Sequence, residues 1–315
     1  MKMSAFNTLL MAALFASSSV ACSALAEIAT EEQILEANRI SESGDSPAAI
    51  KMLLPWAQAG DSMAQNVLGL VYLTSKDIKQ DYTEAGKWLR KSSAQGFAAA
   101  DGNIGTLYEA GFGVKQNAKE AVKWYKKGAA KNEVNSQYNL ARVFEKGIGV
   151  PKDIKEALRL YALASAQGSP TANHNLGGLF MVGADVPQDF AKAREYYTLA
   201  SDLGFGASTN SLGVMALNGM GEEKNPKAAY KYFRKAAQQI DNLAFNNLGV
   251  IFELGLMGKP DLIKAASWYE MAIANGNKDE EESFNKITAK LTPPQVQASN
   301  AFVDRCLNSG YVDCD

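Results

Sequence analysis

The residues that come closest to a catalytic motif are Ser283 and Lys286 in the stretch Ser-Phe-Asn-Lys. Enzymes that recognise penicillins use a serine nucleophile three residues before a lysine for acyl transfer. Those enzymes also need a Ser-Asp-Asn and a Lys-Thr-Gly motif, and the sequence contains neither. We therefore expect Ser283 and Lys286 to lie on a capping helix, and a β-lactamase-like, cell-wall-active enzyme is the least favoured of three functional alternatives.

The histidine content and the net charge give little support for catalysis, metal binding or nucleic-acid binding. His174 is the single histidine, so a histidine metal site or proton relay would have no second member. A lone histidine on a helix is more often structural than catalytic. The formal net charge of −2 gives no basic field for nucleic acid. The sequence predicts a protein that is not an enzyme, binds no metal, cofactor or nucleic acid, and acts through another protein or peptide.

The first 26 residues have the pattern of a secretory signal peptide. Lys2 is their only charge, an apolar run covers residues 5–14, and a small-x-small cleavage site ends at Ala26. We predict cleavage after Ala26, which leaves a periplasmic or secreted mature chain without a transmembrane segment.

Two alternatives for this segment stay open. An uncleaved membrane anchor is one, although the apolar run is short for a bilayer span. Lipidation at Cys22 is the other, because Val20-Ala21-Cys22 resembles the end of a bacterial lipobox, with Ser19 where an aliphatic residue is usual.

Two cysteines remain after cleavage, Cys306 and Cys314. In an oxidising compartment an even pair this close together should form a short disulfide loop that fixes the C-terminal tail. Metal binding is the weaker alternative, because the chain offers one histidine and no further thiol nearby.

An internal repeat organises the rest of the chain. A Leu or Ile followed by a small residue returns every 36 residues without insertion or deletion. The six pairs are Leu68-Gly69, Ile104-Gly105, Leu140-Ala141, Leu176-Gly177, Leu212-Gly213 and Leu248-Gly249. Glycines, capping Asp or Asn residues, alanines and aromatic residues keep the same period, so one structural unit occurs six times.

Each unit has the pattern of two helices. Apolar residues at spacings of three and four around Leu140 predict an amphipathic helix that ends at Gly147. Asp153 then supplies a side chain that can accept the unpaired amides at the start of a second helix, which ends at Gly168. The small residue of each pair, such as Gly177, would allow the two helices to approach closely, so a larger residue there should overpack the hairpin.

A hairpin of this size cannot bury its own apolar face, so successive hairpins must stack. The predicted fold is all-α, a right-handed α-solenoid of stacked 36-residue helix-turn-helix repeats. We expect the protein to be a monomer. The expected divisions are a signal peptide over 1–26, a degenerate N-terminal capping repeat over 27–60, six repeats over 61–276, and C-terminal capping helices with the disulfide-bonded tail over 277–315.

The stretch AAADGNIGTLYEAGFGVKQNAKEAVKWYKKGAAKN and its equivalents resemble the Sel-one-like repeats, relatives of the tetratricopeptide repeat. LTPPQVQASNAFVDRC is similar to the closing helix of bacterial members. The resemblance covers about residues 45–307. It departs at Asn132 and Ile240, which replace the closing glycine, so we expect those two junctions to bend differently.

The resemblance implies an exported, non-enzymatic scaffold or adaptor in the bacterial envelope that binds a partner in its concave groove. A secreted or surface protein that binds a host protein is the second alternative. Fractionation separates the two, because release by osmotic shock indicates the periplasm and recovery from the medium indicates secretion.

A column of asparagines precedes four of the repeated Leu or Ile residues, on the helix that faces the groove in such solenoids. Its members are Asn103, Asn139, Asn175 and Asn247. An asparagine side chain can donate to and accept from an extended peptide backbone. It can equally bridge adjacent repeats and fix their twist. Both interpretations stay open, with bridging favoured.

Overall fold

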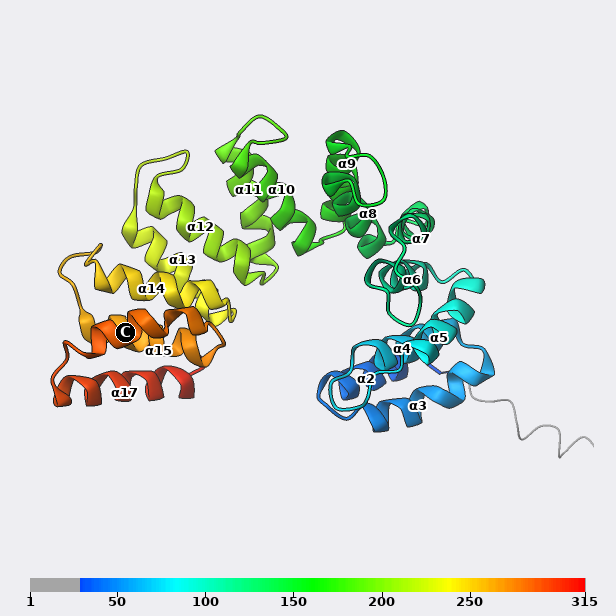
Figure 1. Ribbon diagram of the computed structural model, residues 1–315, viewed down its shortest axis with the longest axis horizontal. Coiled ribbons are helices and arrows are strands. Elements are labelled where there is room, and N and C mark those ends of the chain that lie inside the picture. The colour runs from blue at the N-terminus through cyan, green and yellow to red at the C-terminus, as the bar shows by residue number, and fades with distance from the viewer. Residues whose placement is uncertain (1–28, 315) are drawn as a thin grey trace, which may run out of the picture. The chain divides into compact units, whose positions relative to one another are not determined.

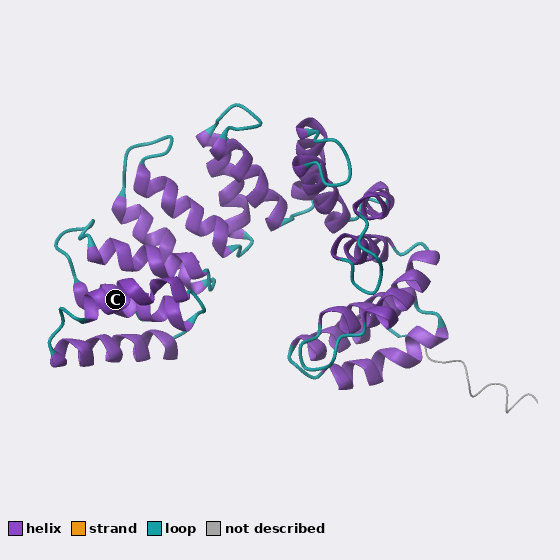
Figure 2. Ribbon diagram, viewed as in Figure 1, coloured by secondary structure: helices purple, strands orange, loops and turns teal. Residues whose placement is uncertain are grey.

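The computed structural model describes residues 29–314, and the predicted signal peptide with Cys22 lies outside them. These residues form sixteen α-helices and one short 3-10 helix, without a strand among them (Figure 2). The contacts divide the chain into two compact units, unit 1 up to Lys152 and unit 2 from Asp153. The predicted all-α class is confirmed.

The helices of unit 1 are α2 (Glu31–Glu42), α3 (Ser46–Ala59), α4 (Ser62–Thr74), α5 (Tyr82–Ala94), α6 (Ala98–Ala110), α7 (Ala118–Ala130) and α8 (Val134–Lys146). The helices of unit 2 are α9 (Ile154–Ala166), α10 (Pro170–Val182), α11 (Phe190–Asp202), α12 (Gly206–Asn218), α13 (Pro226–Gln238), α14 (Asn242–Glu253), α15 (Leu262–Ala274), η1 (Lys278–Glu280), α16 (Glu281–Thr288) and α17 (Pro293–Asn308).

Within each unit the helices pair and stack in sequence order (Figure 1). The hairpins are α4/α5 and α6/α7 in unit 1, and α10/α11, α12/α13 and α14/α15 in unit 2. The second helix of each hairpin also packs on the first helix of the next, as α5 does on α6 and α11 on α12. This is the nearest-neighbour stacking of a solenoid, and it buries the apolar face that one hairpin would expose.

The capping residues lie where the sequence predicts them. In every second helix of a repeat the side chain before the helix accepts a hydrogen bond from a backbone N–H of the first turn. The capping residues are Asp81, Asn117, Asp153, Asp189, Asn225 and Asp261. Each cap satisfies amides that the helix itself cannot pair.

The close approach within a hairpin depends on the small residue of the Leu-Gly pair. A methyl group placed on Gly177 would lie 2.7 Å from Cδ1 of Tyr197, because the tyrosine ring of α11 lies directly over this glycine. Both Leu176 and Tyr197 are buried. The sequence prediction that Gly177 allows close approach is therefore confirmed.

The two departures from the repeat pattern do not change the backbone. Asn132 has a φ of 63° and Ile240 a φ of 58°, so both keep the left-handed conformation that Gly168 adopts at the same point of its repeat. The expectation that these junctions bend differently is wrong, because the packing of the helices on either side fixes the turn. Asparagine tolerates this conformation, whereas a β-branched residue is strained in it.

The C-terminal helices and the tail close the array in unit 2. α16 and α17 pack on α15, and a disulfide joins Cys306 at the end of α17 to Cys314. Both cysteines are buried in one apolar cluster with Phe245, Trp268 and Phe302. The predicted disulfide is present, and its role in fixing the tail stays a prediction.

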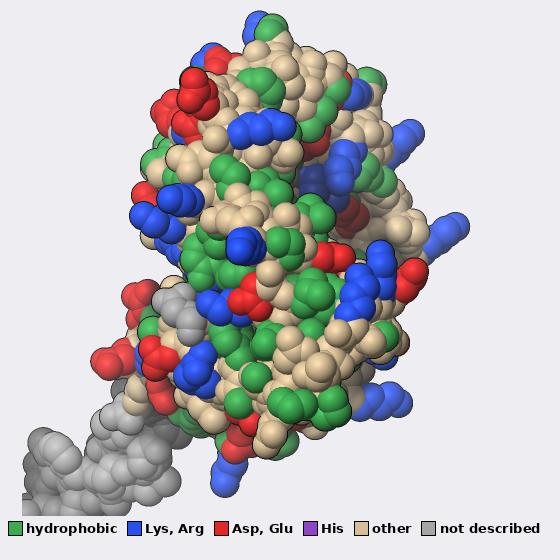
Figure 3. All heavy atoms as spheres, turned by 90° about the vertical axis from the view of Figure 1, so that its left-hand side faces the viewer, with side chains coloured by type: hydrophobic (Ala, Val, Ile, Leu, Met, Phe, Trp, Pro, Cys, Tyr) green, Lys and Arg blue, Asp and Glu red, His purple; other side chains and the backbone are tan. Residues whose placement is uncertain are grey.

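The surface shown in Figure 3 carries acidic and basic side chains interspersed with small apolar areas. This distribution matches the small net charge of −2 and offers no field of one sign on that face. Within residues 29–314, no helix combines the length and apolar character that crossing a bilayer requires.

Gly177→Ala should destabilise the protein by about 1–3 kcal/mol, because the added methyl group has no space under the Tyr197 ring. Gly178→Ala is the matched control in the same helix, since its nearest neighbour is the Tyr197 hydroxyl at an ordinary 3.7 Å. The control should be neutral or slightly stabilising, because alanine favours the helix. Urea unfolding measures both, and equal effects would contradict this account of the packing.

Ile240→Gly should raise the free energy of unfolding by about 1 kcal/mol, because glycine adopts the left-handed conformation without strain. Ile240 is 65% exposed, so little buried surface is lost with its side chain. Urea unfolding at neutral pH measures the change, and a destabilised variant would show that the isoleucine side chain contributes more than its strained backbone costs.

Candidate functional site

The four asparagines of the predicted column lie on first helices of their repeats, on α6, α8, α10 and α14, and all are half-buried. In unit 1, Nδ2 of Asn103 donates to Oδ1 of Asn66 at 2.9 Å. In unit 2, Nδ2 of Asn247 donates to Oδ1 of Asn210 at 2.8 Å. These two bonds join adjacent repeats, as the bridging interpretation predicts, and peptide contact by Asn103 or Asn247 stays a prediction.

Asn175 makes a different contact in unit 2. Its Nδ2 donates to the Tyr161 hydroxyl on α9 at 2.9 Å. The amide nitrogens of Asn103, Asn175 and Asn247 are thus each engaged within the array.

Asn139 differs from the other three. Among the described residues no hydrogen bond involves its side chain. The sequence explains why: Asn103 and Asn247 each bond to an asparagine 37 residues earlier, and the residue 37 positions before Asn139 is Gly102. A glycine has no side chain to bond, so the Asn139 amide is left available to a ligand.

Asn139 lines a hollow of about 340 Å³ in unit 1. The other lining residues come from α6, α7 and α8 and are Thr106, Glu109, Ala110, Tyr125 and Arg142. Arg142 is three residues beyond Asn139 on α8, so the two lie on the same face of that helix. The hollow is open on one side, so an external group can reach both.

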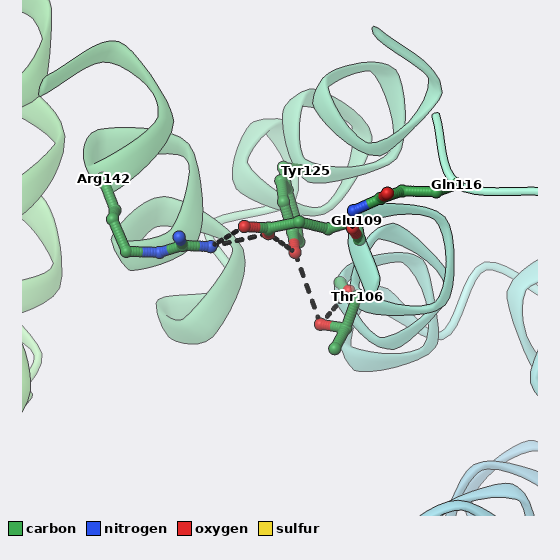
Figure 4. A network of polar contacts seen from close by, with 6 residues as sticks. Thr106, Glu109, Gln116, Tyr125 and Arg142 are labelled. Atoms are coloured by element: carbon green, nitrogen blue, oxygen red, sulfur yellow. Dashed lines mark hydrogen bonds and ion pairs between the residues drawn. The ribbon is translucent and has the colours of Figure 1, made fainter. Parts of the chain in front are cut away.

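An ion pair crosses the hollow from α8 to α6 (Figure 4). Nη2 of Arg142 donates to Oε1 and Oε2 of Glu109 at 2.5 and 2.6 Å. The Tyr125 hydroxyl donates to Oε2 of Glu109 at 2.6 Å and lies 3.4 Å from Oγ1 of Thr106. Gln116 donates to the backbone oxygen of Glu109 at 2.8 Å, which holds the end of α6 in place.

The hydrogen bonds of the network determine the protonation states of Glu109 and Tyr125. Burial alone would raise the pKa of Glu109, but hydrogen bonds from Arg142 and Tyr125 and the charge of Arg142 outweigh it, so this pKa lies below its ordinary value. Burial, with the hydrogen bond to Glu109, raises the pKa of the Tyr125 hydroxyl. At neutral pH Glu109 is ionised, Arg142 is charged and Tyr125 is protonated, which gives a neutral site rich in donors without a free base.

A buried charge cluster holds the first turn of α6. Asp101 is fully buried and pairs with Lys127 at 2.8 Å and Lys131 at 2.7 Å, and it accepts from Oγ of Ser93 at 2.6 Å. Burial would raise the pKa of Asp101, but the two lysines and Ser93 outweigh it and lower this pKa. A buried carboxylate with this many partners holds α5, α6 and α7 in one register.

A second hollow of unit 1, of about 550 Å³, lies beside α2, α4 and the segment after α4. Its main charged group, Asp77, already accepts from the backbone and hydroxyl of Ser46 at 2.7 and 2.6 Å. Those bonds lower the pKa of Asp77 and use its carboxylate within the fold. The hollow beside Asn139 is therefore the better candidate for ligand binding.

The residues considered for catalysis are not assembled into a site. Ser283 and Lys286 lie on α16, and within the described part of the chain no hydrogen bond joins them. His174 lies between the rings of Tyr197 and Phe205, and its Nδ1 is 2.8 Å from Oγ of Ser208. From residue 29 to 314 no group of three or more His, Cys, Asp or Glu side chains is arranged to hold a metal.

Comparison with protein families identifies the repeat. The model of the Sel1 repeat matches residues 62–97, 98–133, 134–169, 170–205, 207–241 and 244–277. The chain belongs to the Sel1 repeat family. The matched segments follow the hairpins, so the Sel1 repeat accounts for the 36-residue period.

One similar solved structure has the same fold. A Sel1 repeat protein from Oxalobacter formigenes is 27% identical, with a TM-score of 0.68 over 76% of this chain and 99% of its own. The immunity protein Pa5087 from Pseudomonas aeruginosa is 18% identical, with a TM-score of 0.49 over 70% of this chain and 83% of its own. No curated protein sequence matches the chain.

The sequence interpretation missed Glu109, Tyr125 and Arg142. A signal was present, because tyrosines recur with the 36-residue period at Tyr125, Tyr161, Tyr197 and Tyr269, with Leu89 and Phe233 in the other two repeats. Tyr125 and Tyr269 donate in the same way, to Glu109 and Glu253, each 16 residues earlier. Arg142 has no such periodic signal.

His174 should titrate below its ordinary value of 6.5, because burial lowers its pKa. The folded chain then binds this proton less readily than the unfolded chain, so the stability that neutral His174 gives is complete above pH 6.5 and is lost as the pH falls toward the folded pKa. An NMR titration of the single imidazole measures this directly. His174→Gln should remove this part of the pH dependence of Tm, and a pKa at or above 6.5 would contradict it.

Proposed function

We propose that this Sel1 repeat protein is a non-enzymatic scaffold that binds an extended segment of another protein at the hollow lined by Asn139 and Arg142. The observation that carries the proposal is the free side chain of Asn139, half-buried beside a neutral ion pair on an open surface. Repeat scaffolds use such surfaces for protein binding.

The chemistry of the hollow suits a peptide main chain. The Asn139 amide can donate to a carbonyl and accept from an N–H of the same peptide group. Arg142 uses only Nη2 for Glu109, which leaves its other nitrogens to donate to a second carbonyl. Because Glu109 balances the charge of Arg142, a neutral backbone binds without leaving a charge unpaired.

We also propose that the protein acts in the bacterial envelope as an adaptor. The buried disulfide between Cys306 and Cys314 supports an oxidising compartment, and the sequence of residues 1–26 supports export. Binding to a host protein after secretion is the second candidate. Cell fractionation by osmotic shock tests the two, since protein recovered only from the medium would overturn the envelope proposal.

Asn139→Ala should weaken binding of a selected peptide by about tenfold, because one hydrogen-bonded amide in a partly desolvated site contributes about 1–1.5 kcal/mol. The ligand is chosen from a displayed random-peptide library on the unmodified chain, and its Kd is measured by calorimetry. Tm should not change, because Asn139 bonds to nothing in the described fold.

Asn103→Ala is the matched control on α6. It should lower the stability by about 1 kcal/mol, because it breaks the bond to Asn66, and it should leave the Kd unchanged, because Asn103 does not line the hollow. If Asn139→Ala lowers Tm and keeps the Kd, Asn139 is structural and the proposed site is wrong.

A further inference from the structure

The C-terminal tail is held in unit 2 mainly through its main chain. Arg234 of α13 donates from Nη1 to the backbone oxygen of Cys314 at 2.8 Å and from Nη2 to that of Val312 at 2.9 Å. A longer contact of 3.5 Å joins Nη2 to the backbone oxygen of Tyr311. One guanidinium thus contacts three carbonyl groups within residues 311–314, which follow α17 in a turn in which Tyr311 has a φ of 67°.

The guanidinium of Arg234 is positioned in advance of this contact. Its Nη1 also donates to the Tyr230 hydroxyl at 3.0 Å, and its centre lies 5.6 Å from the Trp268 ring and 5.8 Å from the Tyr230 ring. Aromatic rings at this distance attract and orient a guanidinium. The donors therefore stay in place whether or not the tail is bound.

Besides the disulfide-bonded Cys314, one further side chain holds the tail. The Tyr311 ring lies edge-on to Phe245, with 4.9 Å between ring centroids, and its hydroxyl accepts from Nδ2 of Asn275 at 2.9 Å. The side chain of Val312 is 59% exposed and does not anchor the tail in this way. The tail thus packs a tyrosine against the fold and leaves the residue after it exposed.

We propose that the surface formed by Arg234, Phe245 and Asn275, the tail-binding surface, is a second peptide-binding site, specific for turn-forming segments that carry a tyrosine. The tail occupies it as an internal ligand. The disulfide keeps the tail at a high effective concentration, so an external segment binds only when the tail is detached. The site lies in unit 2 and shares no residue with the hollow beside Asn139, so either proposal can fail without the other.

The test uses the full-length chain with Cys306→Ser, Cys314→Ser and Tyr311→Ala. These substitutions remove the disulfide and the tyrosine side chain and keep the tail-binding surface. The probe is the fluorescein-labelled peptide Asn-Ser-Gly-Tyr-Val-Asp-Ser, and fluorescence anisotropy measures its binding. We expect saturable binding to this variant and none to the disulfide-bonded chain. Adding Arg234→Gln, or replacing the peptide's tyrosine by alanine, should weaken binding at least about tenfold.

Arg159→Gln is the matched control, since this arginine of unit 2 makes only an exposed pair with Glu156 three residues away. It should leave the peptide's Kd unchanged. Absence of saturable binding, or equal binding of the tyrosine and alanine peptides, would overturn the proposal.

A variant with fewer substitutions tests the proposal if the triple variant loses its helical circular dichroism. In the chain with only Cys306→Ser and Cys314→Ser, the unlabelled peptide should displace the tail and speed amide hydrogen exchange in residues 309–314. Unchanged exchange at saturating peptide would also overturn the proposal.

Discussion

The contact of an aromatic or leucine side chain with the small residue of a Leu-Gly pair is the constraint on which the array depends. It sets how closely the two helices of a hairpin approach, as Tyr197 over Gly177 shows. That approach brings side chains of one hairpin within hydrogen-bond distance of the next, 30 to 37 residues away, as in the Asn103–Asn66 bond. Because each hairpin contacts mainly its neighbours, contacts between adjacent hairpins determine the structure of the array.

The same regularity explains why sites arise where a repeat departs from the pattern. The asparagine that bridges repeats at Asn103 and Asn247 loses its partner at Asn139, because Gly102 stands across from it. The freed amide then faces the ion pair of Glu109 and Arg142. At the C-terminal end, Arg234 contacts the main chain of the tail. We propose that function on such a scaffold comes from exceptions in an otherwise repeated structure.

The sequence predicted most of the fold, because the features that determine it are local. The helices, their capping residues such as Asp153, the close approach at Gly177 and the Cys306–Cys314 disulfide follow from residue type and spacing. The left-handed turn at Ile240 was not predicted, because packing of the flanking helices overrides the preference of a β-branched residue. The network of Glu109, Tyr125 and Arg142 was not predicted, because it depends on which side chains meet across helices.

The central claim is that partners bind at the hollow of unit 1, and cross-linking in the cell tests it most directly. A photo-activated amino acid at Ala110, an exposed residue that lines the hollow, should give a covalent adduct with a partner protein after illumination. The same amino acid at Lys155, exposed on α9 of unit 2, serves as the comparison. The account predicts an adduct from position 110 that Asn139→Ala diminishes. An adduct from position 155 and none from position 110 would contradict it.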